Sequence, residues 1–176
     1  LTAAEFTAAA GAHGLAVGFG DTGSVGLGGI TLGGGVGYLA RKHALTVDSL
    51  LAADVVTADG SVLRVDDESH SDLFWAIRGG GGNFGAVSWL EYRLHPVGTV
   101  TSGLIAYPFE QARNVLKFFR EITSSGLPED LAIFGALLHA PNGDQIAVMI
   151  VCHCGPLAEA EAALQPIKKF GAPILD

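Results

Sequence analysis

The sequence has few cysteines and no long apolar run. Cysteine occurs only twice in 176 residues, at Cys152 and Cys154. Their C-x-C spacing places both thiols on one face of an extended segment, whereas a zinc site needs further ligands at suitable spacing. We therefore predict no metal site. The longest apolar run, Ile146–Cys152, has the length of a strand. It is far below the roughly 18 residues of a membrane-spanning helix, so no membrane partner is predicted.

Basic residues are also scarce. Lys and Arg number 10 against 18 Asp and Glu, which gives a net charge of −8. Binding to nucleic-acid phosphates or anionic membranes needs a basic face, so neither is predicted as a partner. Hydrophobic residues make up 49% of the chain and charged residues 16%, a balance that excludes a disordered chain. The length suffices to bury a core without disulfides or metal.

Glycine, in contrast, is abundant. It accounts for 25 of the 176 residues, about twice the usual ~7%. Residues 1–98 hold 19 of these glycines, and ten lie between Gly18 and Gly37. The content drops after His95-Pro96-Val97-Gly98, where a Pro and a Gly follow a strand-like run. We predict two units, residues 1–98 and residues 99–176.

Local patterns assign elements to the first unit. Asp59-Gly60 between two β-rich runs predicts a hairpin with a type I′ turn, which needs positive φ at both positions. The apolar periodicity and the helix start signals give the other elements. The expected elements are a helix over 1–13, a short helix over 38–43, strands over 53–58 and 61–65, a helix over 71–78 and a strand over 86–94.

The second unit shows the order β-α-β-β-α. Two amphipathic helices alternate with apolar strands, and Pro141-Asn142-Gly143 turns a hairpin. This order predicts an α+β fold with an antiparallel sheet and both helices on one face. The last strand of such a unit is expected past Asp176. The predicted strands cover 99–107, 131–139 and 145–154, and the helices cover 110–122 and 157–170.

The glycine tract from Val25 to Gly37 reads VGLGGITLGGGVG. Such a backbone can approach a ligand closely and adopt positive φ, and successive N–H groups can form an anion-binding concavity. The start of the helix after Gly37 also favours negative charge. We predict a loop over Gly26–Gly37 that enters this helix and binds a pyrophosphate. The alternative is a tight crossover in the core without a ligand.

Two known phosphate-binding motifs were compared with this tract. A P-loop is rejected because no Lys follows the glycines. Gly35–Ala40 fits G-x-G-x-x-G/A, and Asp59 follows about twenty residues later. A nicotinamide-dependent dehydrogenase therefore stays open as an alternative. It requires an apolar strand directly before Gly35, where residues 26–34 contain five glycines.

A second glycine cluster, Gly79–Gly82, ends the predicted helix over 71–78. Asn83 follows it, and Asn tolerates left-handed backbone and can hold a turn through its side chain. Arg78 precedes the cluster and is predicted to form an ion pair. The cluster is predicted to turn the chain from the helix into the next strand.

Two long motifs resemble a known family. They read GGITLGGGVGYLARKHALTVDSLLAADVVTADG and DLFWAIRGGGGNFGAV. Both are similar to the PCMH-type FAD-binding domain of the vanillyl-alcohol oxidase / p-cresol methylhydroxylase superfamily, in its berberine-bridge-like branch of FAD-linked oxidases. The resemblance spans roughly residues 1–98, and residues 99–176 fit the start of the family's substrate domain. The resemblance implies that the chain contains the second subdomain of the flavin domain, followed by an antiparallel-sheet domain.

The resemblance also implies cofactor contacts. Val25–Gly29 with Gly33 and Gly37 would line the pyrophosphate and flavin, and Val87 would meet the adenosine half. Thr22 stands where some members carry a Cys linked to the flavin, and Ile30 where such members carry a His. Ala44 replaces the usual Gly after R-K-H, which we expect to be a mild change. The predicted FAD-binding residues are thus Thr22, Val25, Gly26, Gly29, Ile30, Gly33, Gly37 and Val87.

The implied function is that of an FAD-dependent oxidase. It would remove a hydride from a CH–OH or similar group of a small molecule or sugar, with O₂ as acceptor. The family's flavin-linked His and its tyrosine base are expected outside residues 1–176, so the chain is expected to be a central fragment without a catalytic residue. A non-catalytic FAD-domain fragment is a further alternative. The sequence leaves open a cytoplasmic or a secreted location, the substrate and the oligomeric state.

Overall fold

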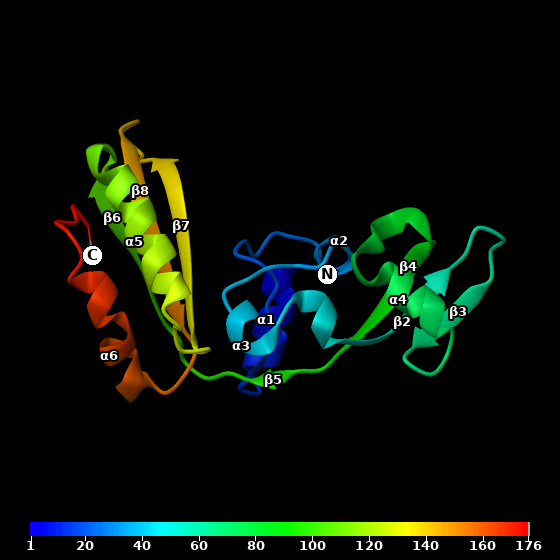
Figure 1. Cartoon of the computed structure of the whole chain (residues 1–176). Coiled ribbons are helices and arrows are strands. Elements are labelled where there is room, and N and C mark those ends of the chain that lie inside the picture. Colours follow the sequence, from blue (N-terminus) through cyan, green and yellow to red (C-terminus); the bar gives the residue numbers. More distant parts are fainter. Residues whose placement is uncertain (176) are drawn as a thin grey trace. The chain divides into compact units, whose positions relative to one another are not determined.

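The chain folds into two compact units that divide between Gly98 and Thr99. The structure is a computed structural model, and it describes residues 1–175. Both units combine helices with antiparallel strands, which confirms the α+β class (Figure 1). No helix among the described residues is long and apolar enough to span a membrane.

The first unit contains a three-stranded antiparallel sheet in the order β3-β2-β4 and a two-stranded pair, β1-β5. Helix α1 begins with a capping box, in which the backbone N–H of Thr2 donates to Glu5 at 2.7 Å. The helices are α1 (Ala3–Gly11), α2 (Leu27–Leu32), α3 (Ala40–His43) and α4 (Ser71–Gly80), with short 3-10 turns η1 (Thr46–Ser49) and η2 (Gly81–Asn83). The strands are β1 (Leu15–Ala16), β2 (Leu50–Val56), β3 (Val62–Asp66), β4 (Ala86–Tyr92) and β5 (His95–Pro96).

The β2–β3 hairpin forms where predicted, but its turn is not type I′. Gly60 has φ +84, whereas Asp59 is not in the positive-φ region. The N–H of Gly60 donates to the carbonyl of Thr57 at 2.9 Å, and the Asp59 carboxylate accepts from the Thr57 hydroxyl and the Ser61 N–H. This is a three-residue loop with one left-handed glycine, because the Asp59 side chain holds the turn that precedes it.

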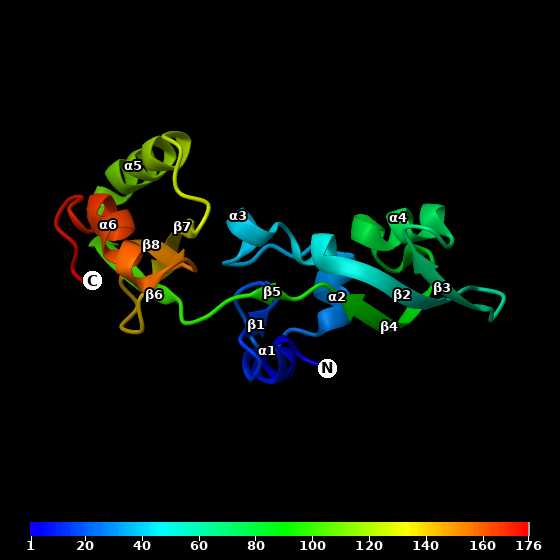
Figure 2. The same cartoon turned by 90° about the horizontal axis from the view of Figure 1, so that it is seen from below.

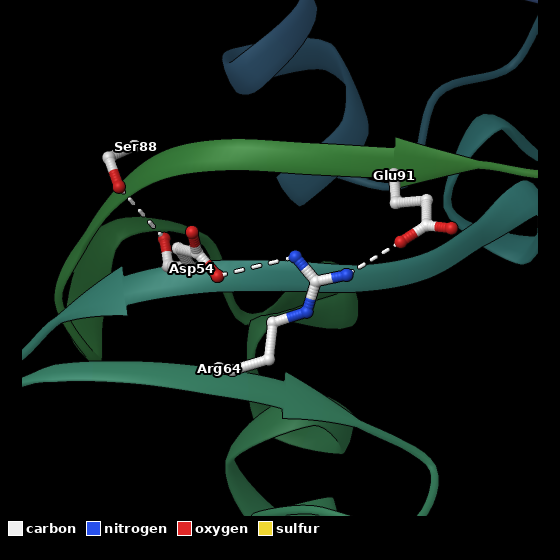
Figure 3. A network of polar contacts seen from close by, with 4 residues as sticks. All are labelled: Asp54, Arg64, Ser88 and Glu91. Carbon is white, nitrogen blue, oxygen red and sulfur yellow. Dashed lines mark hydrogen bonds and ion pairs between the residues drawn. The ribbon is translucent and has the colours of Figure 1, made fainter.

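The two faces of the β3-β2-β4 sheet differ in character. Helix α4 packs Phe74 and Ile77 onto one face, in a core with Leu50, Val55 and Val65. Charged side chains cross the other face, as Figure 3 shows. Its central residue is Arg64, which lies 2.6 Å from Glu91, 3.4 Å from Asp54 and 3.8 Å above the Trp89 ring.

A smaller core holds the start of the chain against the end of β4. Phe6, Phe19 and Tyr92 meet edge to face, with ring centroids 5.0 to 5.6 Å apart. Leu27 of α2 is buried in the same cluster. Leu27 therefore anchors the glycine tract to this aromatic cluster, whose edge-to-face pairs are worth about 0.5–1.5 kcal/mol each beyond area burial.

The second unit has the predicted β-α-β-β-α order. Its antiparallel sheet runs β6-β8-β7, and the hairpin turns at Gly143, which has φ +89. One core contains residues of both helices and of all three strands, so both helices cover the same face, as Figure 2 shows. The elements are β6 (Thr101–Pro108), η3 (Phe109–Gln111), α5 (Ala112–Ser124), β7 (Leu131–His139), β8 (Gln145–His153) and α6 (Leu157–Lys168).

A further segment pairs with β6 near the end of the chain. The Ile174 N–H donates to the carbonyl of Ala106 at 2.8 Å, and the Ala106 N–H donates to the carbonyl of Leu175 at 2.9 Å. This pairing is a single antiparallel bridge between Ala106 and Leu175, and the described residues form no further strand after α6. That the last strand lies past Asp176 therefore stays a prediction.

Candidate cofactor site

The glycine tract folds as a helix followed by a turn, not as the continuous loop that we predicted. Helix α2 covers Leu27–Leu32, and α3 begins only at Ala40. Leu27 and Thr31, four residues apart, are both buried, and the Thr31 hydroxyl lies 2.7 Å from that of Tyr92. These tertiary contacts outweigh the low helix propensity of glycine.

The nicotinamide alternative is wrong. It requires a βαβ unit with a strand directly before Gly35, and the residues there form α2. The strands that the structure describes in residues 1–98 are paired antiparallel. Gly35–Ala40 thus matches the fingerprint in letters but not in structural context.

Some glycines of the tract are required by the fold itself. A Cβ on Gly35 would overlap the Thr46 side chain, and one on Gly37 would lie 2.7 Å from the backbone N of Gly20. Gly20 and Gly35 also have positive φ, at +83 and +76. Close packing of the segments at Gly20, Gly35 and Thr46 explains these glycines without any ligand.

Other glycines have open space around them. A Cβ on Gly26, Gly28 or Gly29 would meet nothing within 4 Å, and none of the three has positive φ. Gly28 and Gly29 lie inside α2, where each glycine costs up to about 1 kcal/mol relative to alanine. Intramolecular packing therefore does not explain them, whereas a ligand lying against the α2 backbone would.

Gly33 is an intermediate case. A Cβ there would lie 3.2 Å from the carbonyl oxygen of Gly29, which is tight. Its φ is −86, so the backbone conformation does not itself require a glycine here. A bulky side chain at this position would disturb α2 itself. Loss of FAD binding by such a variant would therefore not show that Gly33 contacts the cofactor directly.

The remaining predicted residues divide between two places. Thr22 is exposed, with its hydroxyl 3.1 Å from Asp21, and its carbonyl accepts from the N–H of Val25. The Ile30 side chain lies against Gly20, where an added Cβ would be 2.9 Å from Cδ1. Val87 instead lies in β4 opposite Val55 and packs into the core under α4. The structure thus groups the α2 residues but places Val87 in a different cluster.

The second glycine cluster makes the predicted turn. Gly79 and Gly81 have positive φ, at +105 and +67, and the Asn83 amide donates to the carbonyl of Gly80 at 2.7 Å. The guanidinium of Arg78 lies 4.8 Å from the centre of the Phe74 ring. Arg78 is therefore stacked on its own helix rather than in the predicted ion pair.

Sequence reasoning missed three polar residues beside the tract. Thr31 and Thr46 are fully buried, and both make hydrogen bonds to distant parts of the chain. Burial raises the pKa of the Tyr92 hydroxyl despite its bond to Thr31, so this hydroxyl stays neutral at physiological pH. The only signal in the sequence was a hydroxyl residue in an otherwise apolar or glycine-rich run.

Two imidazoles stack next to the end of this region. The ring centroids of His43 and His95 are 4.3 Å apart with 25° between planes, and Nε2 of His95 lies 3.0 Å from the Ser49 hydroxyl. Burial, with a smaller contribution from Arg93, lowers the pKa of His95 below its usual 6.5. The sequence analysis did not predict this pair, since the two histidines lie 52 positions apart in the chain.

Comparison with known proteins agrees with the motifs. Residues 1–66 match the FAD binding domain family. FAD-linked oxidoreductase pgmH of Aspergillus terreus is 35% identical over 164 residues, which are 91% of this chain and 33% of the relative. The chain thus spans about a third of the length of the curated relatives that it matches.

Solved structures of oxidases have the same fold. 6-Hydroxy-D-nicotine oxidase from Arthrobacter nicotinovorans matches with a TM-score of 0.88 and 28% identity, over 100% of this chain and 39% of that one. A chitooligosaccharide oxidase matches with a TM-score of 0.78 and 32% identity, over 99% of this chain and 36% of that one. Berberine bridge enzyme matches with a TM-score of 0.79 and 28% identity, over 94% of this chain and 34% of that one. The chain thus carries the FAD binding domain over residues 1–66, and it is similar in sequence and fold to the berberine-bridge-like FAD-linked oxidases of the vanillyl-alcohol oxidase / p-cresol methylhydroxylase superfamily.

Proposed function

We propose that this chain supplies part of the FAD site and the start of the substrate domain of an FAD-dependent oxidase. The reaction is removal of a hydride from a CH–OH or similar group of a small molecule or sugar, with O₂ as acceptor. Bound FAD would supply the hydride-accepting chemistry. The chain's own residues bind and orient the cofactor.

The observation that carries this proposal is the open backbone of α2. Gly26, Gly28 and Gly29 lie within the segment that matches the FAD binding domain family, and a Cβ at each would meet nothing of the chain itself. Such positions suit the close approach of a flat or phosphorylated ligand to the backbone. Gly26, Gly28 and Gly29 would hold the cofactor, and Ile30, packed on Gly20, would shape the adjoining wall.

The substrate class is drawn from the relatives. The solved neighbours include a chitooligosaccharide oxidase and 6-hydroxy-D-nicotine oxidase, so the fold serves both sugars and small heterocycles. The net charge of −8 favours an uncharged or cationic substrate over a polyanion. We propose a small organic molecule or oligosaccharide as the substrate.

Titration of the 176-residue chain with FAD tests the proposal. In ¹H–¹⁵N NMR spectra, the amides of Gly26, Gly28 and Gly29 should shift progressively with FAD, while those of β7 and β8 should not. Riboflavin serves as the control ligand, since it lacks the pyrophosphate and should bind more weakly. Absence of FAD-dependent shifts in residues 17–47 would contradict the proposal.

The second candidate function is that of an FAD domain that binds the cofactor without turnover. It rests on the absence of a predicted catalytic residue within residues 1–176. Peroxide release from sugars and alcohols, measured on the full-length protein that contains these residues, separates the two functions, since only the oxidase produces it.

A further inference from the structure

Thr46 joins three segments of the chain at the glycine tract. Its side chain is 1% exposed. The hydroxyl donates to the carbonyl of Gly18 at 2.5 Å and lies 3.3 Å from the carbonyl of Gly35. The backbone adds two bonds, because the N–H of Thr46 donates to Gly35 and that of Val47 to Gly34, each at 3.0 Å.

These bonds fix the direction of two peptide groups. The carbonyls of Gly34 and Gly35 both point at η1. Because a trans peptide is planar, its N–H points away from its C=O. The amides of Gly35 and Val36 therefore point to the side opposite η1. That side is open, since a Cβ on Gly34 would meet nothing within 4 Å and Val36 is 63% exposed.

Two successive left-handed glycines make this arrangement possible. Gly34 and Gly35 have φ +109 and +76, and consecutive amides in such backbone can converge on one anionic or carbonyl oxygen. Without an external clamp, two glycines would sample many other conformations. The backbone N–H groups of Thr46 and Val47 supply this clamp, and the Thr46 hydroxyl holds Thr46 in place through its bond to Gly18 and its contact with Gly35.

We propose that Thr46 is a positioning residue of the FAD site. It holds the Gly34–Gly35 backbone so that the amides of Gly35 and Val36 face the cofactor, although Thr46 itself touches only protein. This inference rests on the proposed FAD site. It adds a residue outside the glycine tract on which cofactor affinity depends.

Paired substitutions at this position test the role. Thr46→Val keeps the shape but removes the hydroxyl, which leaves the buried carbonyl of Gly18 without its donor. Thr46→Ser keeps the hydroxyl and removes only a methyl group. Thr46→Val should weaken FAD binding about tenfold or more and shift the free-state amides of Gly35 and Val36, whereas Thr46→Ser should bind within about threefold of the unaltered chain.

Val65→Ala is the control for a general loss of stability. Val65 is fully buried in the core under α4 and has no place in the proposed site. Each variant is titrated with FAD by NMR, and its unfolding is measured in urea. If Thr46→Val does not fold, Thr46→Ala replaces it, since this change also removes the hydroxyl and adds no methyl group in its place.

The outcomes separate this inference from the proposed function. Binding by Thr46→Val at the affinity of the unaltered chain would overturn the inference alone. Equal losses for Val65→Ala and Thr46→Val, or a failure of Thr46→Ser to retain binding, would also overturn it. Absence of FAD binding by the unaltered chain would overturn the proposed function and this inference together.

Discussion

Gly29 provides the sharpest single-residue test of the α2 site. Gly29→Ala should keep or raise the free energy of unfolding, by up to about 1 kcal/mol, because alanine is the better helix former and its methyl meets nothing of the chain. The same methyl should weaken FAD binding at least about tenfold by occupying the space of the ligand. Urea unfolding and the FAD titration measure the two effects.

The matched control for Gly29 is Gly11→Ala in α1. Gly11 is also a helical glycine with open space at its Cβ position, and it lies outside the proposed site. It should gain stability without any change in FAD affinity. If Gly29→Ala bound FAD as tightly as Gly11→Ala, the open space at α2 would have no role in cofactor binding.

Ala44 carries backbone strain that the sequence did not reveal. It has φ +60 and ψ −161, a region that is essentially restricted to glycine and costs about 1–3 kcal/mol for other residues. The prediction that this replacement is mild is therefore wrong. Ala44→Gly should raise the free energy of unfolding by about 1 kcal/mol, after the entropy cost of glycine is subtracted. An unchanged or lower midpoint in urea would contradict this.

His95 should make stability depend on pH. Burial and Arg93 lower its pKa in the folded chain below the 6.5 of the unfolded chain, so the unfolded chain binds more protons below that value. The free energy of unfolding should therefore be retained above pH 6.5 and decrease as the pH falls from 6.5 through the folded pKa. Urea unfolding at several pH values between 8 and 5, with about one unit between steps, measures the slope.

His95→Gln is the control for this slope. Gln does not titrate, and its longer side chain can place the amide near the position of Nε2, which lies 3.0 Å from the Ser49 hydroxyl. The free energy of unfolding of the variant should decrease less below pH 6.5, and the remaining decrease should come from other residues. Equal slopes for the two proteins would show that His95 does not titrate between the folded and unfolded states as described.

At the scale of elements, α6 depends on one buried row of side chains. Ile167 is fully buried in the core of the second unit, whereas Leu157 at the start of the helix is 58% exposed. Ile167→Ala should lower the free energy of unfolding by about 2–5 kcal/mol, and Leu157→Ala should change it by less than about 0.5 kcal/mol. Circular dichroism in urea measures both, and similar losses would mean that α6 is not docked through Ile167.

The elements also differ in how far they could be predicted. The helices and strands of the second unit follow from apolar periodicity, because each element buries one face against the same core. Helix α6 nevertheless ends at Lys168 rather than Phe170. In the first unit, α2 could not be predicted, because two of its six residues are glycines and it is held by long-range contacts such as the Thr31–Tyr92 bond and the packing of Leu27 in the core.

At the scale of the whole molecule, we predict weak cofactor binding by these 176 residues. They span about a third of the length of the matched relatives, so part of the hydrogen bonding to FAD is expected from other residues. The ligand still loses its full translational and rotational freedom on binding. Fluorescence quenching should give a dissociation constant on the order of 10⁻⁴ M or weaker.

Turnover should be undetectable for the same chain. The family resemblance places the flavin-linked His and the tyrosine base outside residues 1–176. Peroxide assays with a panel of sugars and alcohols measure this. Micromolar FAD affinity or measurable peroxide release would mean that the cofactor site or the catalytic groups have been misplaced.

The sequence by itself determined the α+β class, the hairpins and the family. These depend on apolar period, turn residues and two long glycine motifs, which are all local patterns. The predicted contacts of Thr22, Val25, Ile30 and Val87 with FAD remain predictions. Among the glycines, the sequence could not distinguish Gly29, which has open space beside it, from Gly37, which packs on Gly20.

Only the tertiary structure decided which glycines the fold requires and what holds the tract in place. The hydrogen bonds that do so join residues far apart in the chain, from Thr46 to Gly18 and from Thr31 to Tyr92. The bond between Thr31 and Tyr92 spans 61 positions, and no local pattern encodes such a pairing. The positive φ of Ala44, which lies between α3 and η1, likewise belongs to the folded structure, whereas its local sequence would allow an ordinary conformation.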